Sequence, residues 1–178
     1  MLLALDIGNT NIKFGVFDDE DVEPYSPAAT WRLSTDRNRM ADEYSAMLLN
    51  LLHLKGFDAT DVTATAICSG VPSLTQEFVT LCQTYLDINP MVVGSGVKTG
   101  VKVLYDSPRD VGADRIVDAV AALKLYGGPA IIVDFGTGTV FDAVSANAEY
   151  LGGAIAPGIT VAADALFHNA SQLRRVEL

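Results

Sequence analysis

The chain has 178 residues, of which 49% are hydrophobic and 19% charged, and its formal net charge is −10. This composition indicates a globular protein, and its acidity argues against nucleic acid or an anionic membrane surface as a partner. No apolar run approaches the roughly 18 residues of a membrane helix, and the N-terminus lacks the basic start of a signal peptide, so we expect a cytoplasmic protein.

The first 17 residues predict a β-hairpin. An apolar run at 2–5 leads into a short turn, and a second β-rich run at 12–17 leaves it. The turn suits the convergence of backbone N–H groups on an anion, because Gly8 lacks a Cβ, Asn9 tolerates left-handed geometry and Thr10 adds a hydroxyl donor. A phosphate group would fit this turn, and an ordinary hairpin turn explains the same residues equally well.

Two charged residues flank this turn. Asp6 ends the first strand, where it is poorly placed to touch a phosphate directly but well placed to hold Mg²⁺ or its waters beside one. Lys13, in the second strand, would neutralise a terminal phosphate.

The segment up to residue 93 predicts a mixed sheet with helices. An acidic turn, Asp18 to Glu23, separates the hairpin from a third strand, and a strand, helix and strand later form a parallel βαβ unit. Cys68 and Cys82 lie in this segment without metal-ligand spacing, so we expect reduced, buried thiols. The predicted elements are strands at 28–33, 62–68 and 91–93, and helices from Met40 to Lys55 and from Pro72 to about Tyr85.

The remaining segment predicts a second domain. A strand at 101–105 precedes a helix at 112–126 that is apolar on most faces, and we expect this helix to be buried between layers. We place the domain boundary along it, which gives a first domain at 1–118 and a second at 119–178. An amphipathic helix is predicted from about 159 to 170.

A second hairpin repeats the pattern of the first. The apolar run 130–133 ends in Asp134-Phe135-Gly136-Thr137-Gly138-Thr139, and a strand-like run follows at 140–144. Thr137 and Thr139 are either exposed hydroxyls of a hairpin or phosphate contacts, and their position after Asp134 favours the second interpretation. Two such hairpins suggest two related domains that face each other across a nucleotide. This layout resembles the actin-like ATPase and sugar-kinase superfamily.

Two further segments are candidates for chemistry. Gly112-Ala113-Asp114-Arg115 begins a helix, where unpaired N–H groups favour anions. Asp114 is therefore either a helix-terminal carboxylate, with Arg115 paired to Asp118 at the surface, or a base for a substrate hydroxyl, with Arg115 gripping a carboxylate. The glycine-rich segment 152–158 is either a tight turn into the last helix or a wall of the nucleotide cleft.

Four motifs together resemble one family. DIGNTNIK at 6–13, VGADRI at 111–116, DFGTGT at 134–139 and GGAIAPG at 152–158 are similar, in this order, to the motif set of type III pantothenate kinase, also called the Bvg accessory factor family. The resemblance implies an α/β fold of duplicated actin-like (ribonuclease H-like) domains with mixed sheets. It also implies transfer of the ATP γ-phosphoryl group to the primary hydroxyl of pantothenate, the first step of coenzyme A synthesis, by a homodimer.

The resemblance assigns roles to individual residues. Asp114 would be the catalytic base, Asp6 would lie near Mg²⁺ through water, and Asp134 would help to hold a monovalent cation, K⁺ or NH₄⁺. The implied ATP-binding residues are Asp6, Ile7, Gly8, Asn9, Thr10, Asn11, Ile12, Lys13 and Thr137. The implied pantothenate-binding residues are Tyr105, Gly112, Ala113, Asp114 and Arg115.

The chain departs from the family pattern in three places. Gly138 and Val140 replace an Ala and the last Thr of the family's second turn, and 169–174 lacks the family's T-A-x-L-P. Family members continue for several dozen residues beyond Leu178, so we expect the second domain to be incomplete and the sequence to be a fragment or a shortened relative. Two alternatives remain: a nonenzymatic ATP-binding regulator, or a kinase of the same superfamily acting on another small hydroxyl or carboxyl substrate, such as a sugar or acetate.

Overall fold

The computed structural model describes residues 1–18, 26–94 and 96–169. The chain divides into two compact units, Met1–Gly94 and Ser95–Leu178, and each is described by itself. Most of the predicted acidic turn, from residue 19 to residue 23, and the segment from residue 170 onward lie outside the described residues. No helix in the described parts of the chain is long and apolar enough to cross a membrane.

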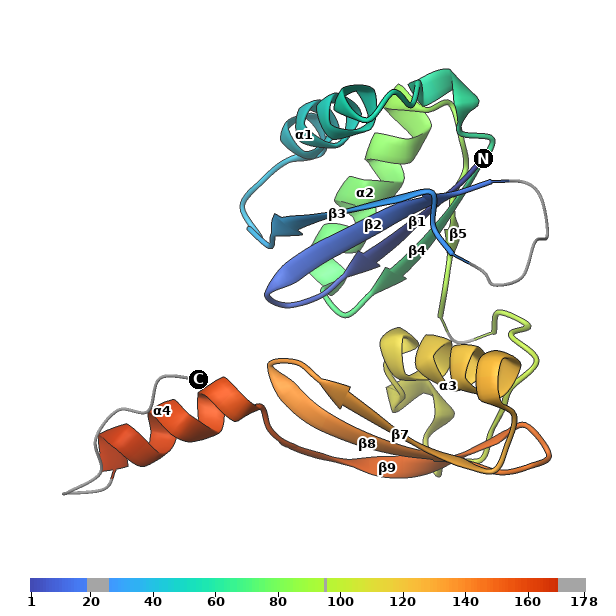
Figure 1. Cartoon of the computed structure of the whole chain (residues 1–178), viewed down its shortest axis with the longest axis vertical. Coiled ribbons are helices and arrows are strands. Elements are labelled where there is room, and N and C mark those ends of the chain that lie inside the picture. Colours follow the sequence, from blue (N-terminus) through green and yellow to red (C-terminus); the bar gives the residue numbers. More distant parts are fainter. Residues whose placement is uncertain (19–25, 95, 170–178) are drawn as a thin grey trace. The chain divides into compact units, whose positions relative to one another are not determined.

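The first unit is a five-stranded mixed sheet with two long helices (Figure 1). The strand order is β3-β2-β1-β4-β5, with β1, β2 and β3 antiparallel and with β4 parallel to both β1 and β5. This topology confirms the predicted antiparallel start followed by a βαβ unit. The elements are β1 (Leu2–Ile7), β2 (Asn11–Phe17), β3 (Ala29–Ser34), α1 (Ala41–Leu54), a 3₁₀ turn (Ala59–Asp61), β4 (Ala64–Ser69), α2 (Pro72–Tyr85) and β5 (Met91–Val92).

The core of the first unit is formed by apolar side chains that occupy every second position of its strands. Leu3, Leu5 and Ile7 of β1 are buried in the same cluster as residues of α1 and α2, where the rings of Tyr44 and Phe78 lie 4.8 Å apart. The intervening residues of β1 belong to the other face of the sheet, because successive side chains of a strand point to opposite faces. Asp6 is therefore carried on the face opposite the core. Cys68 and Cys82 are buried and are not joined in a disulfide, as predicted.

The second unit is a four-stranded sheet of order β6-β9-β8-β7, on which α3 packs (Figure 1). The β7–β8 hairpin is antiparallel, as predicted, and β8 and β9 are also antiparallel. The elements are β6 (Lys102–Val103), a 3₁₀ turn (Pro108–Asp110), α3 (Ala113–Tyr126), β7 (Ala130–Phe135), β8 (Gly138–Val144), β9 (Glu149–Pro157) and α4 (Ile159–Asn169).

The division into units falls earlier in the chain than the boundary expected at 118/119. β6 pairs in parallel with β9, and Val111 and Ile116 belong to one buried cluster with Val144 and Tyr150. The segment 95–118 therefore shares its core with the strands that follow it. Propensity in a single stretch of sequence does not reveal this pairing, because the partners are far apart in the chain.

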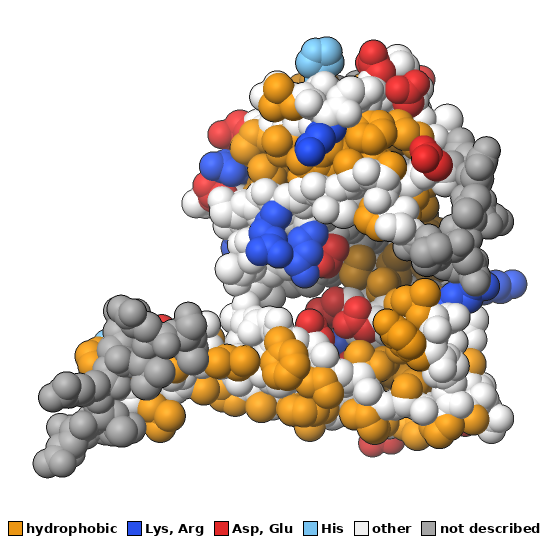
Figure 2. All heavy atoms as spheres, viewed as in Figure 1, with side chains coloured by type: hydrophobic (Ala, Val, Ile, Leu, Met, Phe, Trp, Pro, Cys, Tyr) orange, Lys and Arg blue, Asp and Glu red, His pale blue; other side chains and the backbone are white. Residues whose placement is uncertain are grey.

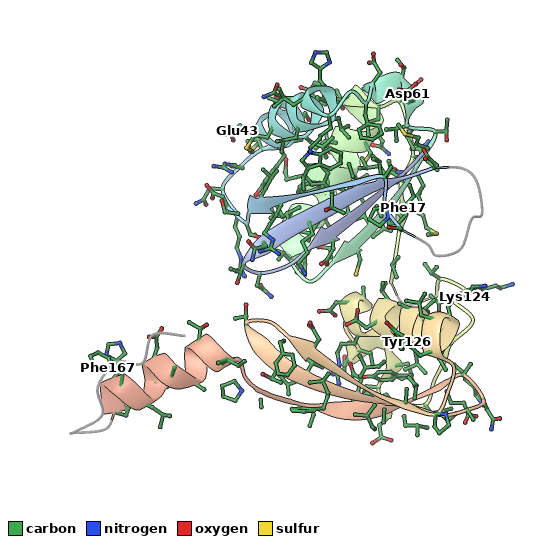
Figure 3. The ribbon with its side chains drawn as sticks, viewed as in Figure 1. Phe17, Glu43, Asp61, Lys124, Tyr126 and Phe167 are labelled. Atoms are coloured by element: carbon green, nitrogen blue, oxygen red, sulfur yellow. The ribbon has the colours of Figure 1, made fainter. Side chains whose placement is uncertain are left out.

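Two local expectations need correction. Residues 152–157 are not a tight turn, because β9 runs through them. The helix α3 is not buried on most faces: Ile116 and Ala119 are buried, whereas Tyr126 at its end is 86% exposed (Figure 3).

The second sheet repeats part of the first. β9-β8-β7 has the antiparallel order of β3-β2-β1, but β1 also pairs with β4, whereas β7 lies at the edge of the sheet as far as the structure describes it. Exposed apolar side chains extend along this strand and its neighbour, and Figure 2 shows apolar surface over this unit. They include Ile131, Val133, Phe135 and Phe141.

Candidate active site

The β1–β2 turn is closed by its glycine. The N–H of Gly8 donates to the carbonyl oxygen of Asn11 over 3.0 Å, and a Cβ on residue 8 would lie 2.9 Å from that same oxygen. Any other residue would therefore push the two sides of the turn apart. The predicted phosphate turn thus has a physical requirement for glycine.

The loop after β3 holds this turn in place through residues that were not among the predicted ATP-binding residues. The hydroxyl of Thr35 donates to the Gly8 carbonyl over 2.6 Å, and its N–H donates to the Thr10 carbonyl over 3.0 Å. Arg37 Nη2 donates to Asn9 Oδ1 over 2.8 Å. Three successive turn residues are thus held by the next loop, and the arginine adds positive charge beside them.

Asp6 and Lys13 face each other across the first two strands. They are register partners, and Lys13 Nζ lies 3.7 Å from Asp6 Oδ2, with both side chains about half exposed. Arg32 on β3 is the register partner of Lys13 on its other side. Figure 2 shows Lys and Arg side chains gathered next to an acidic one on the face of this unit that carries β2 and β3. An accessible carboxylate beside cations suits a hydrated Mg²⁺ carried by phosphate oxygens.

The β7–β8 turn has a similar closure. The Gly136 N–H donates to the Gly138 carbonyl over 2.9 Å, and the Gly158 N–H donates to the Thr137 carbonyl over 3.0 Å. A Cβ on Gly158 would overlap the backbone of this turn, which explains the glycine after Pro157. Asp134 and Thr137 are exposed here, whereas Thr139 is buried, so the two threonines do not share one role.

Asp134 is an exposed carboxylate beside a turn with backbone carbonyls, which are the oxygen ligands that hard cations take. Among the described residues, no group of three or more His, Cys, Asp or Glu side chains forms a metal site. A cation at Asp134 would therefore depend on backbone and substrate oxygens for its other ligands.

Asp114 lies in the first turn of α3 with its carboxylate folded back over the helix start. Its Oδ1 accepts a hydrogen bond from the Arg115 N–H over 3.0 Å, and a Cβ on Gly112 would lie only 2.3 Å from that oxygen. The side chain is exposed. The carboxylate thus does serve the helix terminus, and Gly112 leaves the room in which it sits.

Arg115 makes a buried ion pair that was not predicted. Its Nε lies 3.0 Å and 3.3 Å from the two carboxylate oxygens of Asp142 on β8, and its Nη2 lies 2.5 Å from Asp142 Oδ1. Asp142 is 2% exposed and the Arg115 side chain 15% exposed, so this is not the surface pair with Asp118 that spacing allowed. The hydrogen bonds that the guanidinium donates to Asp142 raise the pKa of Arg115.

Tyr150 on β9 completes this network. Its hydroxyl donates to Asp142 Oδ1 over 2.7 Å, and the guanidinium carbon of Arg115 lies 5.7 Å from its ring centroid. The residue is fully buried, and this burial, together with the hydrogen bond to Asp142, raises the pKa of the Tyr150 hydroxyl far above its ordinary value.

The glycines of β9 make room for the cluster. A Cβ on Gly152, which has a φ of +115°, would lie 3.2 Å from the ring of Tyr105. Gly153 is the register partner of Asp142, and a Cβ there would lie 2.7 Å from Arg115 Nη2. Tyr105 and Arg115 therefore lie against a stretch of bare backbone, which neither earlier interpretation of the glycine-rich segment anticipated.

Known proteins match the chain over nearly its whole length. A model of the family described as type III pantothenate kinase matches residues 2–178. The type III pantothenate kinases of Moorella thermoacetica and Roseiflexus sp. are 51% and 50% identical over 178 residues, which is 100% of this chain and 68% of each relative. This chain thus spans about two thirds of their length.

Solved structures show the fold. The ethanolamine utilization protein EutJ of Carboxydothermus hydrogenoformans aligns with 97% of this chain and 57% of its own, at a TM-score of 0.53 and 13% identity. The neighbouring structures are of the actin-like ATPase and sugar-kinase fold, as predicted. With the family match and the curated relatives, this shows that the chain belongs to the type III pantothenate kinases, the enzymes of the first step of coenzyme A biosynthesis.

Proposed function

We propose that the two clusters described above carry the kinase reaction of the family in this chain. The β1–β2 turn, from Asp6 to Lys13, takes the phosphates of ATP. Three features support this assignment: the glycine-closed turn, the hydroxyl of Thr35 holding it, and the basic side chains on the same face. Thr137 in the second turn is a further nucleotide contact.

The cluster at the start of α3 takes pantothenate. Tyr105, Gly112 and Ala113 line the substrate, Arg115 binds its carboxylate, and Asp114 accepts the hydrogen of its primary hydroxyl. An ordinary aspartate, with a pKa of about 3.9, is a weak base toward an alcohol. In a loose phosphoryl-transfer transition state the proton moves late, so Asp114 acts mainly by orienting the hydroxyl. The exposed Asp114 carboxylate, held beside the buried Arg115–Asp142 pair, is the observation that carries this proposal.

The finer points of the proposal concern cations, assembly and location. Mg²⁺ accompanies ATP near Asp6 and reduces the charge of the phosphates, and K⁺ or NH₄⁺ is held with the help of Asp134. Oxygen ligands at both carboxylates suit these hard cations. We also propose a homodimer in the cytoplasm, and the exposed apolar side chains of β7 are consistent with self-association.

The Asp114→Asn substitution tests this assignment. It keeps the size of the side chain but removes the base, so turnover should fall by roughly 10²-fold or more. Isothermal titration should show that ATP and pantothenate still bind with affinities near those of the unmodified chain. Asp118→Asn, one turn further along α3, is the matched control and should retain turnover. Near-normal turnover in Asp114→Asn would remove this residue from its proposed role.

A further inference from the structure

The Arg115–Asp142 pair fixes the direction in which the arginine faces. Asp142 contacts Nε and Nη2, which form one edge of the guanidinium. The group is planar and carries five N–H donors in a rigid fork. Because the group is rigid, a carboxylate bound at the Nε–Nη2 edge also fixes the position of the other edge, which is formed by Nη1 and Nη2. That second edge offers another pair of donors in the arrangement that binds a carboxylate with two hydrogen bonds.

Asp142 is itself held in place on two sides. The Tyr150 hydroxyl donates to its Oδ1 over 2.7 Å, and the Tyr150 ring lies near the guanidinium at 5.7 Å. The backbone at Gly153, opposite Asp142, has no side chain, and a Cβ there would lie 2.4 Å from Asp142 Oδ1. Residues of β8 and β9 therefore together fix the position of the Arg115 guanidinium, which extends from α3.

The pair also affects the neighbouring carboxylate. Asp114 and Arg115 are adjacent in the chain, and an arginine without a buried partner would pair readily with such a neighbour. Because Asp142 is buried and binds through both oxygens, it is the stronger competitor for the guanidinium. The Asp114 carboxylate is thereby kept available for a substrate hydroxyl.

We propose that Asp142 and Tyr150 are positioning residues for pantothenate: they hold the Nε–Nη2 edge of Arg115 so that its Nη1–Nη2 edge is presented to the substrate carboxylate beside Asp114. This inference rests on the proposed function of the α3 cluster. It extends the substrate site to two residues that do not themselves touch substrate.

The test compares Asp142→Asn and Tyr150→Phe in the full chain. Asp142→Asn should raise the KM for pantothenate about tenfold or more, because small misplacements of a binding group weaken substrate binding steeply, while the KM for ATP stays unchanged. Tyr150→Phe, which removes one hydrogen bond to Asp142, should raise the KM for pantothenate less. The matched control is Ser145→Ala in the β8–β9 turn, which removes the 2.9 Å hydrogen bond from Ser145 to Glu149 and those that the Ser145 hydroxyl accepts from the N–H groups of Asn147 and Glu149.

The outcomes distinguish a positioning role of Asp142 and Tyr150 from a purely structural one. A purely structural pair would lower the amount of folded protein, measured by circular dichroism, and leave both KM values unchanged, which would overturn the inference while the proposed function stands. Should Asp142→Asn fail to fold, an unchanged pantothenate KM in Tyr150→Phe would overturn it alone. Absence of pantothenate phosphorylation in the unmodified chain would instead refute the proposed function, and the inference with it.

Discussion

At the scale of single residues, the site depends on a charge that the sequence analysis did not single out. Asp142 stands in the run Val140–Val144, on the same face as its two apolar ends. A charged residue at a core-facing position of a strand is costly unless it is paired, and this was the available signal. Its partner, Arg115, lies on another element, so the residue type could be recognised from sequence but the pairing could not. By contrast, local turn chemistry pointed directly to Gly8.

The buried Tyr150 hydroxyl predicts a dependence of stability on pH. Its pKa is raised in the folded chain by burial and by Asp142, whereas an unfolded tyrosine ionises near pH 10. Its contribution to stability is therefore fully present below pH 10 and is lost as the pH rises beyond it, by about 1.4 kcal/mol per pH unit.

Tyr150→Phe should abolish this loss. Urea unfolding should show that the stability difference between the unmodified chain and Tyr150→Phe shrinks by about 1.4 kcal/mol between pH 8.5 and pH 11. Tyr126→Phe, at the exposed end of α3, is the matched control, with a change within about 0.5 kcal/mol at either pH. A difference for Tyr150→Phe that stays constant over this range would contradict the account.

At the scale of elements, the spacing of hydrophobic residues predicted the strands and helices whose pattern is contained in a single stretch of sequence. Both hairpins, the βαβ unit and the helices α1 and α2 follow from alternation and helical spacing, and their bounds agree within a few residues. β9 was missed because glycines are expected in turns, whereas Gly152 and Gly153 lie in a strand that side chains approach closely. The pairing of β6 with β9 joins segments that are far apart in the chain, so no local sequence pattern predicts it.

The hydrogen bond from the loop after β3 to the β1–β2 turn can be tested by its effect on ATP binding. Thr35→Val keeps the shape of the side chain but removes the 2.6 Å hydrogen bond to the Gly8 carbonyl. One such bond contributes about 1 kcal/mol, so the Kd for a nonhydrolysable ATP analogue should rise about fivefold. The affinity for pantothenate should not change. Titration calorimetry measures both affinities.

Thr30→Val, at an exposed position of the preceding strand β3, is the matched control and should bind the analogue with the affinity of the unmodified chain. An unchanged affinity for the ATP analogue in Thr35→Val would show that this hydrogen bond does not shape the phosphate turn.

At the scale of the whole molecule, the fold rests on a repeated strand arrangement. Each unit contains an antiparallel three-stranded order that begins with an Asp- and Gly-containing hairpin, and the sequence repeat at Asp6 and Asp134 indicated this duplication. The expected boundary was less accurate, because α3 and β6 take their packing partners from strands that come later in the chain. The motif residues were predictable, whereas Thr35, Arg37, Asp142 and Tyr150, which support them, emerge only from the contacts.

The most direct test of the central claim is the identity of the acceptor of the phosphoryl group. The full chain is incubated with ATP, Mg²⁺ and K⁺ together with pantothenate, a sugar or acetate, and ADP and phosphorylated products are identified by mass spectrometry. We expect ADP release that depends on pantothenate and yields 4′-phosphopantothenate. Phosphorylation of the sugar or acetate instead, or binding of ATP with no acceptor-dependent ADP release, would contradict it.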